Sequence, residues 1–363
     1  MNESETMDLS RAFLRLLVIA ALAGWGAAAA AQTPGRLILN GAAGLSGDIV
    51  AVSPNGVEIE VRGESQQVPI ETIRELTFAG EPQGLKSARV AIMRGQPAQA
   101  LEDVGSIPPE EMEGADQLIV DELAFVKAAA IGGQAAAGGQ DVAAGLQAVQ
   151  NYLGKHPQSH HLLSMQELLA QLLARSGKFD EAAKALAPLD RGPRSYQVRA
   201  AAARAGLFFD QKKYDDAARE YAAAAQIPTD PKDAASATQK RLAQLGVARC
   251  RSRQGKADEA VEIVERIVAE AAPDDVDLLG ASYNTLGDAL RAAGKDQDAI
   301  IAFLTVDLVH NKVVENRAEA LFNLAELWEK GRFPQRAEDA RQQLLQAYPD
   351  SRWAAKAQGG KGP

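Results

Sequence analysis

The sequence predicts a mainly α-helical protein, an α-solenoid of stacked helical hairpins preceded by a small antiparallel β barrel or sheet. Three observations predict this fold class. Alanine and leucine dominate the apolar residues, while aromatic residues make up only 5% of the chain, which favours closely packed helices. A glycine-centred turn recurs along most of the sequence, which is typical of helical-hairpin repeats. Short runs rich in isoleucine and valine are concentrated before Phe78, where they predict strands.

The β segment extends from Gly35 to Phe78. Its short apolar runs alternate in part and are separated by glycine, serine, proline and asparagine. The stretch SPNG, Ser53–Gly56, joins two alternating runs and has the residues of a tight reversal. This spacing predicts four or five antiparallel strands. The pattern resembles that of SH3-like small barrels.

The helical segment is marked by its turns, which are separated by 35 to 44 residues. They are centred on Gly95, Gly139, Gly177, Lys212, Gly255, Gly294 and Gly331. Glycine suits these positions because a chain leaving a helix adopts a left-handed backbone conformation there, which costs glycine little. Each interval is long enough for two helices. The sequence therefore predicts stacked hairpins from about Leu85 to Ala357.

One unit carries a nameable pattern, SYNTLGDALRAAGKDQDAIIAF, residues 282–303. Its apolar and small residues fall at fixed positions of two helices: Tyr283, Leu286, Gly287, Leu290, Ala299 and Phe303. With these positions the chain resembles a tetratricopeptide repeat (TPR) protein. The C-terminal stretch LLQAYPDSRWAAKA resembles the ends of TPR modules of the bacterial cell envelope.

The TPR resemblance implies a superhelix whose concave wall is formed by the first helix of each unit and holds peptides or partner helices. The residues that it places on this wall are Glu167, Gln171, Arg175, Arg249, Arg253, Asn284, Asp288, Arg291, Phe322 and Glu326. The basic trio that family members use to clamp a C-terminal carboxylate is not complete in any unit. Protein or peptide partners are therefore predicted, but not that particular ligand mode.

The N-terminus predicts export. Two arginines precede an apolar run, Leu16–Ala31, which is shorter than the roughly 20 residues of a membrane span. Its Ala-x-Ala ending predicts a signal peptide cleaved after Ala31, and hence a periplasmic or secreted protein. An uncleaved membrane anchor is the alternative, and Met7 is an alternative start. The domain prediction is a signal peptide at 1–31, an SH3-like β domain at 32–82, a TPR-like domain at 83–357 and a disordered tail at 358–363.

Charge and cysteine content exclude several classes of function. The net charge is −9 and no basic stripe is present, so nucleic acid is not a predicted partner. The single cysteine, Cys250, can form no internal disulfide. No histidine is near it in sequence to activate it, so we predict a small buried hydrophobe.

The Gly-Lys pair at Gly177 is of the kind that can cradle a phosphate. A phosphate loop, however, has a serine or threonine after the lysine, and Phe179 stands there. The pair also recurs at other turns, so we predict a turn between helices.

Three histidines form the other candidate cluster, His156, His160 and His161. Two of them are four residues apart, as metal ligands on a helix would be, but Pro157 lies between them and rules out one continuous helix. We therefore predict solvated or capping histidines. No catalytic constellation, metal site or cofactor site is predicted, and the protein is predicted not to be an enzyme.

Two hypotheses for function follow. The first is an exported, non-catalytic scaffold that binds protein partners or peptides on the concave face of the TPR superhelix. The second is a module that binds or helps to assemble the cell wall, in which the β domain contacts peptidoglycan and the repeats act as a spacer.

Overall fold

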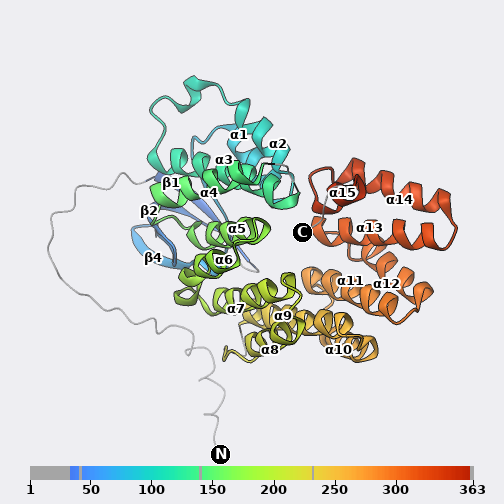
Figure 1. The fold of residues 1–363 in the computed structure, drawn as a ribbon. Helices are drawn as coiled ribbons and strands as arrows, with labels where there is room; N and C mark the ends of the chain where they lie inside the picture. Colours follow the sequence, from blue (N-terminus) through green and yellow to red (C-terminus); the bar gives the residue numbers. More distant parts are fainter. Residues whose placement is uncertain (1–32, 41–42, 139–140, 231–232, 360–363) are drawn as a thin grey trace, which may run out of the picture. The chain divides into compact units, whose positions relative to one another are not determined.

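The computed structural model describes residues 33–40, 43–138, 141–230 and 233–359, and these comprise a β sheet followed by helical hairpins (Figure 1). The predicted signal peptide, residues 1–31, lies outside the described residues, as do the predicted turn centre Gly139 and residues 360–363 of the predicted tail. Within the described ranges, no helix is both long enough and apolar enough to cross a membrane.

The sheet has five antiparallel strands in the order β4-β3-β2-β1-β5. They are β1 (Thr33–Leu39), β2 (Leu45–Ser53), β3 (Gly56–Val61), β4 (Glu64–Pro69) and β5 (Ile73–Phe78), with a 3-10 helix, Ile70–Thr72, before β5. The predicted small antiparallel sheet is confirmed, whereas its SH3-like assignment stays a prediction. The predicted reversal joins β2 to β3, where Ser53 Oγ donates a hydrogen bond to the Gly56 carbonyl at 3.1 Å.

The sheet shares one hydrophobic core with the first three helices. These are α1 (Gln83–Met93), α2 (Pro97–Gly105) and α3 (Gln117–Ala137). Leu37 and Ile59 from the sheet are fully buried in one cluster with Leu85 of α1 and Val126 of α3. The strand-to-helix boundary lies near residue 82, but the core runs across it.

The remaining helices continue the hairpin pattern. They are α4 (Val142–Lys155), α5 (Leu162–Arg175), α6 (Phe179–Ala185), α7 (Arg194–Asp210), α8 (Tyr214–Ala225), α9 (Ala234–Arg253), α10 (Ala257–Glu270), α11 (Val276–Ala292), α12 (Asp296–Leu308), α13 (Val314–Lys330), α14 (Pro334–Ala347) and α15 (Arg352–Ala357). Short 3-10 helices span Pro109–Met112 and Ala187–Arg191.

Within the described ranges, α1 to α14 form seven hairpins, and α15 follows the last of them. The odd-numbered helices from α1 to α13 pack against one another in succession and form a continuous layer. Helices α8, α10, α12 and α14 lie outside this layer (Figure 1). A single hairpin cannot bury its own apolar face, so each hairpin buries it by stacking against its neighbours.

The turns inside the hairpins share one backbone geometry. A positive φ, between 60° and 77°, occurs at Gly95, Gly177, Lys212, Gly255, Gly294 and Arg332. The next amide then bonds back across the turn, as from Lys295 N to the Leu290 carbonyl at 2.9 Å, which closes the helix end. The Gly-Lys pairs are thus helix-to-helix turns, as predicted. In the last hairpin the left-handed residue is Arg332, one place after the predicted Gly331.

Two substitutions test the cost of this conformation. Gly294 has φ +76° and open space where a Cβ would lie, so Gly294→Ala should cost about 1 kcal/mol of folding free energy through the backbone alone. Lys212 already occupies the same conformation at φ 60°, so Lys212→Gly should be neutral or stabilising by up to about 1 kcal/mol. Urea unfolding of both variants would measure these values, and a loss of stability in Lys212→Gly would contradict this account.

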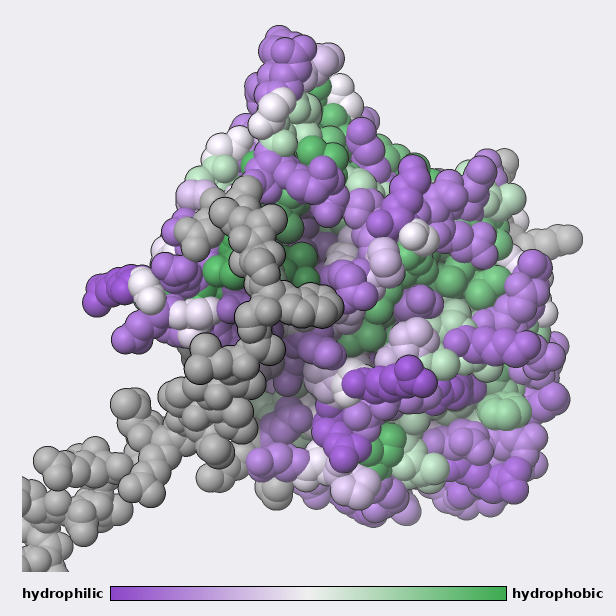
Figure 2. Space-filling model, turned by 90° about the vertical axis from the view of Figure 1, so that its left-hand side faces the viewer, coloured by the Kyte–Doolittle hydropathy of each residue, from purple (hydrophilic) through white to green (hydrophobic). Residues whose placement is uncertain are grey.

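The apolar side chains are mostly gathered inside. The face shown in Figure 2 is largely hydrophilic, with apolar residues in patches between polar ones. The most exposed large apolar residues among those described lie on α12 or directly after it and are Ile301, Leu308 and Val309.

Candidate peptide-binding groove

A hollow of about 340 Å³ lies on the layer of odd-numbered helices, between α7, α9 and α11. Its lining residues are Phe209, Arg249, Ser252, Arg253, Thr285, Asp288, Arg291 and Ala292. Four of the ten predicted wall residues are therefore brought together here: Arg249, Arg253, Asp288 and Arg291. We call this hollow the inner groove.

Helical periodicity explains which side chains reach the inner groove. On α9, Arg249, Ser252 and Arg253 follow the spacing i, i+3, i+4, which places them on one face of a helix. Their neighbours Ala248 and Cys250 point into the core and are fully buried. The other half of the lining was not predicted and comprises Ser252, Phe209, Thr285 and Ala292. The same spacing would have found Ser252 beside the two arginines.

The inner groove carries unpaired positive charge. Within the described part of the chain, Arg249 and Arg253 make no ion pair and no hydrogen bond, and the guanidinium of Arg249 lies 5.3 Å from the ring centre of Phe209. Arg291 differs, because its guanidinium contacts Asp288 at 3.3 Å and Glu326 at 3.0 Å. The hydrogen-bond donors of both guanidinium groups are thus available to an anion, although carboxylates such as Glu319 lie near enough to Arg249 to raise its pKa.

Two polar atoms at or beside the inner groove also have no partner. Ser252 Oγ and Asn284 Oδ1 are buried and form no hydrogen bond with any described residue. The amide of Asn284 is anchored on its other side, since Nδ2 donates to the Asn316 carbonyl at 2.8 Å. Buried polar atoms are normally hydrogen-bonded. These two buried atoms therefore have unused hydrogen-bonding capacity at or beside the inner groove.

The structure uses several other predicted wall residues internally. Glu167 forms an ion pair with Arg199 of α7. Arg175 donates from Nη1 to the Ala136 carbonyl of α3 at 3.1 Å. Gln171 of α5 is exposed.

Phe322 was predicted to face a ligand, but it is only 5% exposed. Its ring lies 5.4 Å from the ring of Trp353 in α15. The short helix α15 covers this part of the layer. The sequence pattern of one repeat unit does not predict a contact with a helix from outside that unit. Asn284 is likewise 2% exposed, so only its unpaired oxygen is a candidate contact.

Helix α15 also meets the first hairpins. Asp350 Oδ2, just before α15, accepts a hydrogen bond from Ala98 N at 3.3 Å. A Cβ placed on Gly138 would lie 2.8 Å from the Cβ of Ala355, so the two backbones approach closely. The two ends of the helical array are therefore in contact.

Glu319 of α13 is the acidic counterpart of Arg249. Burial raises the pKa of its carboxyl from 4.5 to about 7, and the neighbouring Asp288 adds to this, while Arg249 opposes it. Asn284 Nδ2 lies 3.3 Å from Glu319 Oε2. Glu319 thus changes its charge near neutral pH.

The raised pKa of Glu319 predicts a pH-dependent stability. The unfolded chain loses this proton near pH 4.5 and the folded chain near pH 7, so the free energy of unfolding should fall as the pH rises between these values. Glu319→Gln should therefore be more stable than the wild type at pH 8, by on the order of 2 kcal/mol, and equal to it at pH 4. Urea unfolding at both pH values measures this difference. The exposed Glu326→Gln serves as control, and an equal gain there would contradict the assignment.

Two further sequence predictions have structural outcomes. Cys250 is fully buried, as predicted, and burial raises the pKa of its thiol to about 11, so it stays protonated. Of the predicted solvated or capping histidines, His156 and His161 do occupy helix caps, at the end of α4 and the start of α5, but the prediction that they are solvated is wrong. The side chains of His156, His160 and His161 are only 17%, 10% and 19% exposed, because α3 packs over them.

The helical part has the fold of TPR-like repeat proteins, as predicted. No protein-family model matches the sequence, and no curated protein matches it. Solved structures do match, and they show the fold alone because their sequences are distant.

One match is the Rap protein in complex with competence and sporulation factor, with a TM-score of 0.50, 14% identity, and coverage of 77% of this chain and 76% of that one. Another is NprR in complex with its cognate peptide NprX, with a TM-score of 0.45, 14% identity, and coverage of 76% and 81%. A tetratricopeptide repeat protein from Parabacteroides merdae matches with a TM-score of 0.43, 17% identity, and coverage of 73% and 91%.

Proposed function

We propose that this protein is a non-catalytic scaffold that binds an extended peptide segment of a protein partner in the inner groove. The observation that carries the proposal is the pair of guanidinium groups, Arg249 and Arg253, that form no direct ion pair with a described residue and line a hollow between α7, α9 and α11, each the first helix of its hairpin. The solved match of the Rap protein in complex with competence and sporulation factor agrees with this use of the fold.

The chemistry of the inner groove selects an acidic segment. Three arginines and one aspartate line it, in a protein whose net charge is −9, and of these arginines only Arg291 forms an ion pair with a described residue. An aspartate or glutamate side chain of the ligand would pair with Arg249 and Arg253. Ser252 Oγ and the ring of Phe209 would contact the adjoining peptide backbone and an apolar side chain.

A library of random peptides displayed on phage tests this proposal. Peptides selected on the wild-type protein should be enriched in aspartate and glutamate. Their affinity should fall at least tenfold, about 1.4 kcal/mol or more, in the double variant Arg249→Ala, Arg253→Ala, because each charged hydrogen bond contributes about 1.5 to 3 kcal/mol.

The matched control removes the same charge elsewhere. Arg266 of α10 and Arg336 of α14 are exposed and form no ion pair with a described residue, so Arg266→Ala, Arg336→Ala should leave affinity unchanged. Selection of no peptide, or peptides that bind both double variants equally, would overturn the proposal.

We propose that this scaffold works outside the cytoplasm, in the periplasm or as a secreted protein. The support is the arginine-flanked apolar run and its Ala-x-Ala ending at Ala31. Intact-mass analysis of protein recovered from its native source should give a mature chain that begins at Gln32. A full-length chain in the soluble cytoplasmic fraction would contradict export.

A further inference from the structure

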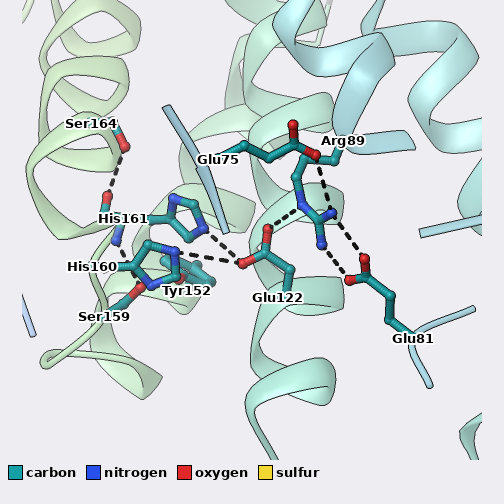
Figure 3. Close-up of polar contacts among 9 residues, drawn as sticks. All are labelled: Glu75, Glu81, Arg89, Glu122, Tyr152, Ser159, His160, His161 and Ser164. Carbon is teal, nitrogen blue, oxygen red and sulfur yellow. Dashed lines mark hydrogen bonds and ion pairs between the residues drawn. The ribbon is translucent and has the colours of Figure 1, made fainter. Parts of the chain in front are cut away.

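A buried polar cluster joins α3 to the start of α5, away from the inner groove. Figure 3 shows the imidazole rings of His160 and His161 directed at the carboxylate of Glu122. Glu122 Oε2 lies 2.8 Å from His161 Nε2 and 3.8 Å from His160 Nε2. One ligand atom from each of the three residues lies within 4.8 Å of the others.

The protein holds these side chains in place. Ser159 Oγ accepts a hydrogen bond from His161 N at 3.0 Å and is itself 2.7 Å from the hydroxyl of Tyr152. The ring of Phe125 stacks on His161 with a centre-to-centre distance of 3.4 Å. On the far side of Glu122, Arg89 Nε donates to Oε1 at 2.9 Å, which leaves Oε2 to the histidines. Such outer contacts orient ligands in metal sites.

The carboxylates around Glu122 outnumber the arginine that pairs with them, so the balance of charge depends on the two histidines. Arg89 is in contact with three carboxylates, those of Glu75, Glu81 and Glu122. Three negative charges and one positive charge give −2 when the histidines are neutral. Glu81 and Glu122 are 0% and 2% exposed, and buried charge without compensation is costly. A divalent cation would neutralise the cluster.

We propose that Glu122, His160 and His161 bind a divalent transition-metal ion, with zinc as the ion that best suits two imidazoles and one carboxylate. Bonds of about 2.0 to 2.2 Å in a tetrahedron place ligand atoms about 3.3 to 3.5 Å apart. The observed separations of 2.8 and 3.8 Å bracket this spacing. All three ligand atoms lie within 4.8 Å of one another, so shifts of up to about 1 Å would seat the ion.

Three protein ligands leave a fourth coordination position open. His160 and His161 line a hollow of about 190 Å³, together with Asp121, Tyr152 and His156. The open position faces this hollow, where water or a small anionic ligand would complete the tetrahedron.

Cobalt titration of the metal-stripped full chain tests the proposal, because tetrahedral Co²⁺ absorbs strongly in the visible region and Zn²⁺ displaces it. We expect one equivalent of Co²⁺ to bind with a tetrahedral spectrum. His160→Ala and Glu122→Gln should each weaken binding at least about tenfold, since even outer-shell changes weaken metal sites by this much. His310→Ala, which removes a histidine stacked on Tyr283 far along the chain, should change nothing.

Zinc should also raise the melting temperature of the wild type and of His310→Ala, but not that of His160→Ala. A wild type that gives no tetrahedral cobalt spectrum overturns the proposal, whatever the variants do. Cobalt binding that survives in both His160→Ala and Glu122→Gln, with circular dichroism showing folded protein, overturns it equally.

Discussion

Gly287→Arg should abolish the packing of one helical hairpin and lower the free energy of unfolding by more than about 4 kcal/mol. Gly287 lies in α11 against the fully buried ring of Phe303 in α12. Even a Cβ at this position would lie 2.5 Å from Phe303 Cζ, closer than carbon atoms can approach. Gly287→Ala alone should therefore cost about 2 to 3 kcal/mol, and the arginine more, because its side chain cannot leave the contact.

Thermal unfolding followed by circular dichroism measures this effect, with a melting temperature at least roughly 10 °C lower expected for Gly287→Arg. The control is Gly154→Ala in α4, an exposed helical glycine with no atom near the place that a Cβ would take. That change should be neutral or stabilising by up to about 1 kcal/mol. A wild-type melt for Gly287→Arg would refute the helix contact.

Arg89→Met should cause a loss of similar size, about 3 to 5 kcal/mol, because it strands buried carboxylates. The guanidinium of Arg89 contacts Glu81 Oε2 at 2.7 Å and Glu122 Oε1 at 2.9 Å. Methionine fills similar space but offers no positive charge. Adding Glu81→Gln to Arg89→Met should restore part of the stability, because one of the unpaired charges is then removed.

Arg219→Met is the matched control for Arg89→Met. The side chain of Arg219 is 78% exposed, and its ion pair with Asp216 lies on the surface of α8. Its loss should change stability by less than about 0.5 kcal/mol. Urea unfolding measures the stability of both variants. Equal midpoints for the two would show that the buried ion pairs of Arg89 do not stabilise the contact between the sheet and the first helices.

The hairpins could be predicted from the sequence because their signals are local. The sequence pattern of a single repeat unit is enough to predict the left-handed turn at Gly294 and the small residue at Gly287. Half of the inner groove followed from the same periodicity, as at Arg249 and Arg253. What escaped prediction depends on how distant units meet, because no local pattern encodes it. Phe322 is covered by α15, a helix from beyond its own hairpin.

The histidine cluster escaped prediction for the same reason. Glu122 and His161 are 39 residues apart and belong to different hairpins. In the connection between α4 and α5 the histidines surround a proline, so the local sequence is that of a solvated turn. Only the packing of α3 against them supplies the carboxylate and buries most of their surface.

The contact between α15 and the first hairpins limits the gain or loss of repeat units in this chain. An open solenoid tolerates the gain or loss of a unit, because each unit touches only its neighbours. Here Asp350 reaches Ala98 and Ala355 abuts Gly138 only when the right number of hairpins lies between them. Deleting or duplicating one hairpin would move α15 away from the first hairpins and break both of these contacts. The number of repeats is therefore a fixed property of this protein, as it is in a β-propeller, whose blades close into a ring.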